Sequence, residues 1–183
     1  VNQMKNPEVK MWMCFPSIYS FSLSSLGYLW ISKEYEERDD VYVERVCSDT
    51  ALTHLSPKEL DFIAFSFSFD LDFLNIFKML DKYNIPLKAE DRDESYPLVM
   101  VGGPVVTANP MPYSKFFDVF FIGDGEGINS KVVDVYKANK GKSKDEILKA
   151  LSELDGVFVP KYKKEVQKTT VKLENCVYTP IIS

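Results

Sequence analysis

Residues 97–110 read PLVMVGGPVVTANP, a short apolar run that ends abruptly in two glycines and a proline. Two other fragments have the same form, DFIAFSFSFDLDF at 61–73 and FFDVFFIGDGEG at 116–127. Apolar runs of this kind, each followed by a segment that can start a helix, are typical of strands in a parallel sheet. Ligands of open α/β sheets bind at the carboxyl ends of the strands, so we expect any functional site at these junctions.

The alternation of strands and helices continues on both sides of these fragments. Apolar or alternating runs predict earlier strands at 10–15 and 39–46. Between them, Ser24 or Ser25 can cap a helix in which Leu26, Leu29 and Trp30 share one face. A chain built in this order favours a parallel sheet with helices on both faces.

Cap residues mark the later helices. Ser56 and Glu59 predict a short helix before the strand at 62–67, and Ser143 with Glu146 predicts another helix start. Apolar residues at helical spacing predict helices over 71–83 and 126–138, and Asn109 followed by Pro110 is typical of a further helix start. The elements predict an α/β fold with a parallel five-stranded sheet in three layers. We expect one domain over 1–156 and a β-rich hairpin or strap over 157–183.

Composition limits the classes of function. The 183 residues carry a net charge of -5, which argues against a general nucleic-acid or anionic-membrane binder. No apolar run approaches the roughly 20 residues that span a bilayer. The first ten residues lack the apolar stretch of a secretory signal. Cys14, Cys47 and Cys176 are widely spaced, which is typical of reduced thiols in a cytoplasmic protein.

Two glycine-marked junctions allow two interpretations each. Gly102 and Gly103 either form a tight turn that needs a positive φ or let a ligand approach the main chain closely. At 123–126, GDGE adds carboxylates, so that Asp124 either caps the next helix or contributes to a site. This fragment is not the GxGxxG fingerprint of dinucleotide-binding proteins.

Polar side chains at the other junctions are weaker candidates. Ser66 and Ser68 end the strand at 62–67, where their hydroxyls could line a crevice, although no nucleophile-elbow pattern surrounds them. The loop from Pro16 to Tyr19 either forms another wall of this crevice or is an ordinary connection. His54 is the only histidine, and we expect it in a solvated loop, which leaves little basis for a catalytic triad or a histidine metal site.

Taken together, these stretches resemble the N-terminal region of cobalamin-binding-type radical SAM proteins, Fe-S oxidoreductases of unknown substrate. The resemblance runs from about residue 11 to residue 160, and it is carried mainly by GGP at 102–104 and GDGE at 123–126. It implies a Rossmann-like, flavodoxin-like domain with strand order 2-1-3-4-5 that precedes a radical SAM barrel. In such proteins the barrel holds a [4Fe-4S] cluster through CxxxCxxC and cleaves S-adenosylmethionine.

The chain departs from the family pattern in two places. No CxxxCxxC motif occurs, so we expect the cluster and the S-adenosylmethionine chemistry only in a barrel outside this chain, which would be a domain cut from a larger enzyme. No DxHxxG motif occurs either, and His54 does not fall in such a pattern. If cobalamin binds, the resemblance therefore implies binding through shape and backbone contacts, without a histidine below the cobalt.

We therefore expect a non-catalytic accessory domain whose crevice presents a cofactor or substrate to the barrel of its own full-length chain. Glycines would admit a bulky ligand and carboxylates would orient its polar groups. The alternatives are a structural module that packs on the barrel without a ligand and, with less support, a free-standing flavodoxin-type enzyme; a homodimer is also open. The expected crevice residues are Pro16, Ser66, Ser68, Gly102, Gly103, Pro104, Thr107, Gly123, Asp124, Gly125 and Glu126.

Overall fold

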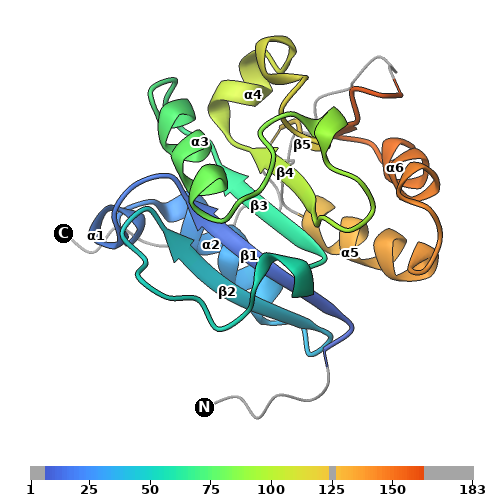
Figure 1. Ribbon diagram of the computed structural model, residues 1–183, viewed down its shortest axis with the longest axis horizontal. Helices are drawn as coiled ribbons and strands as arrows, with labels where there is room; N and C mark the ends of the chain where they lie inside the picture. Colours follow the sequence, from blue (N-terminus) through green and yellow to red (C-terminus); the bar gives the residue numbers. More distant parts are fainter. Residues whose placement is uncertain (1–6, 124–126, 163–183) are drawn as a thin grey trace, which may run out of the picture.

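The computed structural model describes residues 7–123 and 127–162, which form an α/β fold built on a six-stranded sheet (Figure 1). The strands are β1 (Val9–Phe15), β2 (Val41–Cys47), β3 (Phe62–Ser66), β4 (Leu98–Gly102), β5 (Val119–Phe121) and β6 (Val157–Phe158). The α-helices are α1 (Tyr19–Ser22), α2 (Leu26–Glu36), α3 (Asp72–Lys82), α4 (Pro104–Ala108), α5 (Ile128–Asn139) and α6 (Lys144–Ser152). Short 3₁₀ turns are η1 (Pro57–Glu59), η2 (Ala89–Asp91) and η3 (Met111–Tyr113).

The strands lie in the order β2-β1-β3-β4-β5-β6. The first five are parallel, as predicted. The predicted count of five is wrong, because Val157 and Phe158 pair with Phe121 and Phe120 as a sixth, antiparallel strand. Two helices separate β5 from β6, where a parallel crossover usually has one, and the chain enters β6 in the opposite direction. The rest of the predicted strap, residues 163–183, lies outside the described residues.

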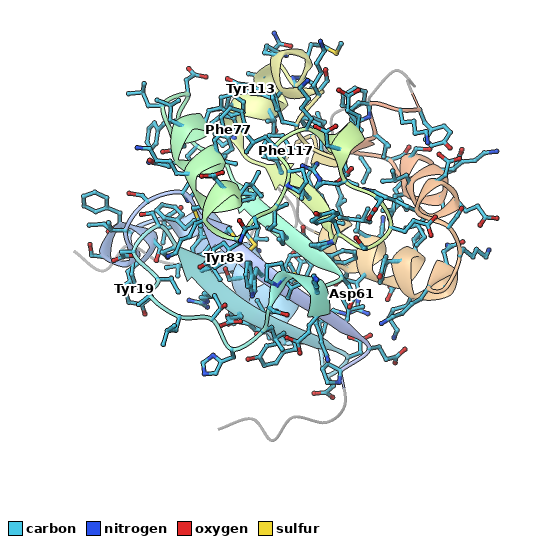
Figure 2. All side chains as sticks on the ribbon, in the orientation of Figure 1. Tyr19, Asp61, Phe77, Tyr83, Tyr113 and Phe117 are labelled. Atoms are coloured by element: carbon cyan, nitrogen blue, oxygen red, sulfur yellow. The ribbon has the colours of Figure 1, made fainter. Side chains whose placement is uncertain are left out.

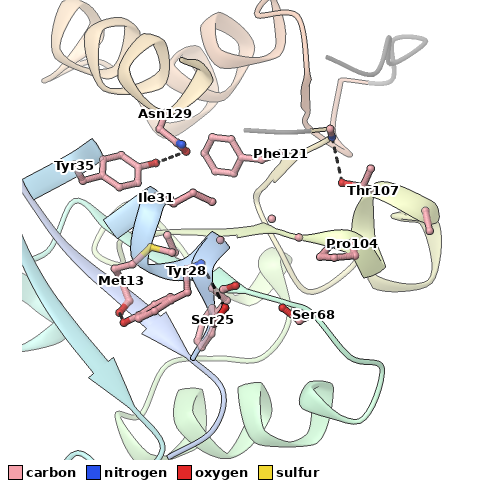
Figure 3. Close-up of a pocket in the computed structure, with 18 residues that line it drawn as sticks. Met13, Ser25, Tyr28, Ile31, Tyr35, Ser68, Pro104, Thr107, Phe121 and Asn129 are labelled. Carbon is pink, nitrogen blue, oxygen red and sulfur yellow. Dashed lines mark hydrogen bonds between the residues drawn. The ribbon is translucent and has the colours of Figure 1, made fainter. Parts of the chain in front are cut away.

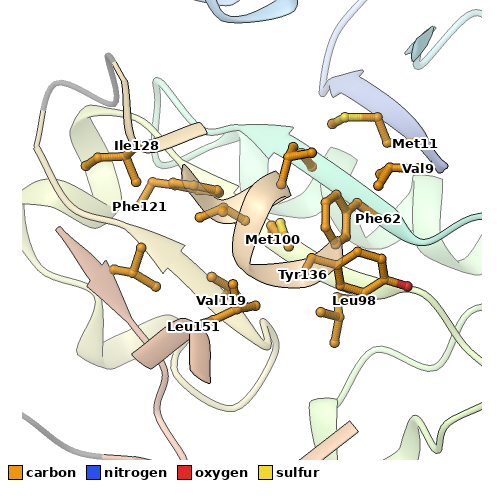
Figure 4. Packing of buried hydrophobic residues seen from close by; sticks show 14 of the residues in the cluster. Val9, Met11, Phe62, Leu98, Met100, Val119, Phe121, Ile128, Tyr136 and Leu151 are labelled. Carbon is orange, nitrogen blue, oxygen red and sulfur yellow. The ribbon is translucent and has the colours of Figure 1, made fainter. Parts of the chain in front are cut away.

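Helices α2, α5 and α6 cover one face of the sheet, and Figure 4 shows part of this core, with Tyr136 of α5 close to Phe62 of β3. On this face Met11, Phe62 and Met100 pack with Tyr136 of α5 and Leu151 of α6. Side chains alternate between the two faces of a strand, so the residues between these point to the other side. Both faces of the central strands are buried, which explains why their sequences are continuously apolar.

Helices α3 and α4 cover the opposite face, where Trp12 and Ile63 pack with Leu80 and Val106. Aromatic rings extend this core toward the η3 turn, and Figure 2 shows Phe77 and Tyr113 on this side of the molecule. The ring of Phe73 lies 4.1 Å from that of Phe77 and 4.9 Å from that of Tyr113, measured between centroids. The α3 side is therefore an aromatic layer.

The phenylalanine series at 62–73 is mainly core. Phe62, Phe65 and Phe67 are buried, whereas Phe69 is 72% exposed. Phe69 follows the end of β3, where the chain has left the sheet. Its exposure adds to an apolar surface that is described with the site below.

Helix α2 begins at the predicted cap, since the Ser25 hydroxyl accepts a hydrogen bond from the Tyr28 amide at 3.4 Å. Of the face named from the sequence, however, only Leu29 packs against the core, whereas Leu26 is 82% and Trp30 is 55% exposed. Tyr28 and Tyr35 are buried instead, and the Tyr28 hydroxyl donates to the Met13 carbonyl at 2.9 Å. The hydrogen bonds of these amphipathic tyrosines to partners in the core thus determine which side of α2 faces the sheet.

Asn109 and Pro110, the predicted helix start, precede only the 3₁₀ turn η3, and the α-helix of this region begins before Asn109. Helix α4 begins five residues earlier, with Pro104 in its first turn, and ends at Ala108. Gly103 allows this because its φ of 120° turns the chain directly from β4 into the helix. Asn109 follows the helix, and its side chain accepts a hydrogen bond from the Met111 amide at 3.2 Å.

The capping box of Ser143 and Glu146 is confirmed at the start of α6, while that of Ser56 and Glu59 starts only the 3₁₀ turn η1. None of the helices in the described ranges is long and apolar enough to cross a membrane.

Candidate functional site

A cavity of about 660 Å³ opens at the carboxyl ends of β3 and β4, between α2, α4 and α5 (Figure 3). This volume lies within the range of pockets that enclose small organic ligands. Its described lining residues come from four strands, three helices and the junctions between them: Met13, Ser25, Gly27, Tyr28, Ile31, Tyr35, Ala64, Phe65, Ser66, Ser68, Gly102, Gly103, Pro104, Thr107, Ala108, Phe121, Gly123 and Asn129.

Small side chains on one face of the sheet create this space. Along β3, Phe62 is followed on the same face by Ala64 and Ser66, because side chains two positions apart share a face. Along β4, Met100 is followed in the same way by Gly102. Ser66 pairs with Gly102 in the register of the two strands. The large residues fill the core, and the small ones leave it open toward the carboxyl edge.

The two glycines at the end of β4 have different roles. Gly103 has a φ of 120°, and a β-carbon built on it would lie 2.4 Å from the Phe67 carbonyl oxygen. The turn therefore requires a glycine, as one of the two interpretations held. Gly102 has an ordinary backbone, and a β-carbon there would lie 3.3 Å from Cβ of Phe121. Both also line the cavity, so a ligand in it lies close to their main chain.

Hydroxyl groups supply most of the polarity near the opening. Thr107 Oγ1 accepts a hydrogen bond from the Gly123 amide at 3.1 Å, which joins α4 to the end of β5 (Figure 3). The hydroxyls of Ser66 and Ser68 have no hydrogen-bond partner among the described residues. They are half-buried and can therefore hydrogen-bond to a ligand.

A buried polar pair closes the cavity between α2 and α5. The Tyr35 hydroxyl donates to Asn129 Oδ1 at 2.9 Å, and Asn129 Nδ2 donates to Glu34 Oε2 at 3.0 Å. Figure 3 shows Tyr35 and Asn129 joined on the side opposite Thr107. Burial raises the pKa of Tyr35, so its hydroxyl stays protonated and donates to the amide oxygen at physiological pH.

The described wall of the cavity is electrically neutral. Its residues are apolar, glycine, hydroxyl-bearing or amide side chains, without an aspartate, glutamate, lysine, arginine or histidine among the described ones. The site can therefore enclose a ligand through shape, apolar contact and a few hydrogen bonds. Among these residues there is no acid–base pair or nucleophile–base pair with which to perform catalysis.

Comparison with known proteins identifies the chain. A family model described as "Radical SAM proteins, N-terminal" matches residues 47–160, well over half of the sequence. The chain belongs to this family. No curated protein and no solved structure matches it.

The family match starts at the last residue of β2 and ends after β6, so it covers β3, β4 and the α4 side of the cavity. The α2 wall of this radical SAM N-terminal domain lies before the matched range. Cavity residues such as Tyr28 and Tyr35 are thus properties of this chain that the family match does not address.

Seven of the residues named from the sequence line the single cavity described above. They come from the ends of three strands that are distant in the sequence and from helix α4, and the parallel sheet brings these segments to one edge. They are Ser66, Ser68, Gly102, Gly103, Pro104, Thr107 and Gly123.

Of the remaining four sequence candidates, one does not join this group and three cannot be placed. Pro16 is buried but is not among the cavity residues, and its carbonyl accepts a hydrogen bond from Asn75 of α3 at 3.0 Å. The chain after β1 passes over the α3 side of the edge before it enters α2, which explains this difference. Asp124, Gly125 and Glu126 lie outside the described residues.

Sequence reasoning missed the helical wall. Tyr28, Ile31 and Tyr35 come from α2 and Asn129 comes from α5. The signal that could have found them is topological: in order 2-1-3-4-5, the helices after β1 and β5 lie on the same face and flank the point where the strand order reverses.

Metal-binding side chains are not gathered at the cavity. His54 is 86% exposed, and its ring lies 3.2 Å from Glu44 of β2. Cys14 and Cys47 are buried in β1 and β2, and burial raises the pKa of both thiols. Within the described ranges, no cluster of three histidine, cysteine, aspartate or glutamate side chains could hold a metal ion.

Exposed apolar side chains lie in the segments that follow β1 and β3, and two of them, Leu26 and Phe69, are next in sequence to cavity residues. We call them the apolar collar, and they are Ile18, Tyr19, Phe21, Leu23, Leu26, Trp30, Phe69, Leu71 and Leu74. Scattered apolar side chains are normal on a surface, whereas a group at one edge indicates a contact site.

Proposed function

We propose that this radical SAM N-terminal domain holds a ligand at the carboxyl edge of its sheet and presents it to the catalytic barrel of a larger protein. The observation that carries the proposal is the convergence of Ser66, Gly102, Thr107 and Gly123 on one cavity of ligand size. Residues from separate strands meet there in a Rossmann-like arrangement. Ligands of open α/β sheets occupy this position.

Cobalamin is the ligand that we propose first. The two glycines and the small side chains beside them would accept a bulky group against the main chain, and the serine hydroxyls would hydrogen-bond to its amides. His54 hydrogen-bonds to Glu44 and is not a cavity residue, so the cobalt would receive no imidazole from the described residues. When bound, a corrinoid supplies a metal centre for redox or alkyl-transfer chemistry.

The chemistry of bond breaking would lie elsewhere in the full protein. We propose that a barrel holds the [4Fe-4S] cluster and S-adenosylmethionine and acts as a cytoplasmic oxidoreductase. In support, the described cavity wall has no thiolate, carboxylate or base. The domain would orient the ligand and shield it from water.

Titration with hydroxocobalamin tests this proposal. We expect a change in its visible absorbance that saturates, and co-elution of the corrinoid with the 183-residue chain in gel filtration. The matched comparison is Gly102→Leu, which places a side chain in the space next to Phe121. If neither a spectral change nor co-elution occurs at high micromolar concentrations, cobalamin is not the ligand.

A purely structural module is the second candidate, and the apolar collar favours it. In this alternative the collar packs on the barrel and no ligand binds. This alternative predicts no pocket of ligand size, whereas the cavity measures about 660 Å³. Substitution of Phe69 and Leu71 by serine in the full-length protein distinguishes the two candidates. If the domain no longer associates with the barrel but still binds its ligand, the collar has a docking role that is separate from the ligand site.

A further inference from the structure

We infer that the group enclosed by the cavity is uncharged and mainly apolar, and that Gly27 in the first turn of α2 keeps its entrance open. This inference rests on the proposed function, because it specifies the chemistry of the ligand at the same site. It follows from the polarity of the wall, from the way its polar atoms are already paired, and from the surroundings of Gly27.

The described part of the wall offers no counter-charge to a ligand. Met13, Ala64 and Phe121 form an apolar floor on the sheet, and Ile31 continues it on α2. A charged group enclosed between these side chains would lose its hydration without gaining an ion pair. Phosphate, carboxylate and ammonium groups are therefore unsuited to the interior.

Other polar atoms of the wall are already hydrogen-bonded within the protein. Tyr35 donates to Asn129, Asn129 donates to Glu34, and Thr107 accepts from the Gly123 amide. The side-chain hydroxyls without a partner among the described residues are those of Ser66 and Ser68. They suit a carbonyl, amide or ring nitrogen at the outer end of an otherwise apolar group.

Gly27 has no structural reason to be a glycine. It lies inside α2, where glycine is less favourable than alanine, and it is not among the described glycines with positive φ. A β-carbon built on it meets no atom within 4 Å, so packing does not exclude a side chain. It does line the cavity. What the glycine provides is open space at the entrance.

A pair of naphthalene dyes of similar size tests the inference. Prodan is uncharged, and its emission shifts to shorter wavelength in an apolar site, whereas anilinonaphthalene sulfonate carries a negative charge. We expect Prodan to bind the 183-residue chain saturably with a blue-shifted emission. We expect the sulfonate to bind about tenfold more weakly or worse at the same site, measured by displacement of Prodan.

Two substitutions of Gly27 test whether this position controls access to the cavity. Gly27→Trp fills the entrance and is expected to weaken Prodan binding by about tenfold or more, while Gly27→Ala changes it by less than about threefold. Lys33→Trp is the matched control, because it adds the same side chain to an exposed position of α2 that is not among the cavity residues. Circular dichroism and thermal unfolding verify that each variant is folded.

A collar variant separates the cavity from the surface around it. Phe69→Ser with Leu71→Ser removes exposed apolar side chains that are not cavity residues, so Prodan binding should persist. Equal Prodan affinity in wild type and Gly27→Trp, loss of binding in the collar variant, or tighter binding of the sulfonate would each overturn the inference. If hydroxocobalamin does not bind, but Prodan binds and its binding depends on Gly27, the cofactor proposal is rejected and this inference is retained.

Discussion

Gly103 lies against the main chain of Phe67, so closely that a β-carbon on this glycine would be 2.4 Å from the Phe67 carbonyl oxygen. The Phe67 amide in turn donates to the Gly102 carbonyl at 2.8 Å. These contacts lock the end of β3 to the turn between β4 and α4. At the edge on which the cavity opens, the main-chain contact with Phe67 therefore allows only glycine at position 103.

Gly103→Ala should destabilise the fold strongly. The substitution combines a positive φ with a collision against a main-chain carbonyl, and we expect a loss of about 2–5 kcal/mol in the free energy of unfolding. Gly102→Ala is the matched control, with an ordinary backbone and a tight contact to Phe121 of 3.3 Å, and should cost about 1 kcal/mol or less. Urea denaturation of both variants measures the difference. Similar losses for the two would contradict the conformational role given to Gly103.

Asp118 is expected to be the most sensitive charged position of the core. It accepts hydrogen bonds from Arg92 at 3.2 Å and from the Val99 amide at 2.9 Å, and both side chains of the Arg92–Asp118 pair are buried. Asp118→Ala leaves a buried guanidinium without its counter-charge, so we expect a loss of about 3–5 kcal/mol.

The control for Asp118 is Glu90→Ala, which removes an exposed ion pair with Lys88 and should change stability by about 0.5 kcal/mol or less. Thermal unfolding compares the two variants. A small effect of Asp118→Ala would show that Arg92 is held well enough by its carbonyl partners at Pro86, Leu87 and Phe116.

Acid should unfold the protein partly through Asp40. Hydrogen bonds from Arg38 at 2.9 Å and from Lys137 at 2.6 Å lower the pKa of Asp40. Because the folded pKa lies below the unfolded value of about 4, this stabilisation is complete above that value and declines as the pH falls below it. Asp40→Asn should therefore be less stable than wild type at pH 7 and show a shallower loss of stability below about pH 4. Parallel pH profiles for the two proteins would exclude this role of Asp40.

Tyr35→Phe should loosen the wall between α2 and α5. The change deletes the hydroxyl that donates to Asn129 at 2.9 Å inside the core, and we expect a cost of about 1–2 kcal/mol. Tyr19→Phe removes an exposed hydroxyl and should be near neutral. Chemical denaturation gives both values, and an equal effect of the two would mean that the buried hydrogen bond does not stabilise the helix pair.

The strands and helix starts were predictable where the signal is local. The capping box of Ser143 and Glu146 lies within four residues, and the buried strands are continuously apolar because both of their faces are covered. The side of α2 that faces the core was not predictable from apolar spacing. It depends on the hydrogen bonds from Tyr28 and Tyr35 to partners far along the chain.

The cavity was predictable on the strand side and not on the helix side. Ser66, Gly102 and Gly123 mark strand ends, and parallel strands bring such ends together. Pro16 marks a strand end as well but lies on the α3 side, because the chain after β1 crosses that side first. Gly27 has no distinguishing sequence context; only its open surroundings in three dimensions reveal it.

The reversed direction of β6 determines where the polypeptide departs. From Phe158 the backbone heads away from the cavity, and at Tyr162 it lies beside the first turn of α6, where the Tyr162 hydroxyl contacts the Asp145 carbonyl. If the proposed catalytic barrel follows Tyr162 in the full protein, its connection to the glycine-rich rim would have to return along the height of the sheet. At about 3.3 Å per extended residue, a five-residue strand such as β4 corresponds to roughly 17 Å. Shortening the connection should therefore separate this domain from the barrel before it disturbs the fold of either unit.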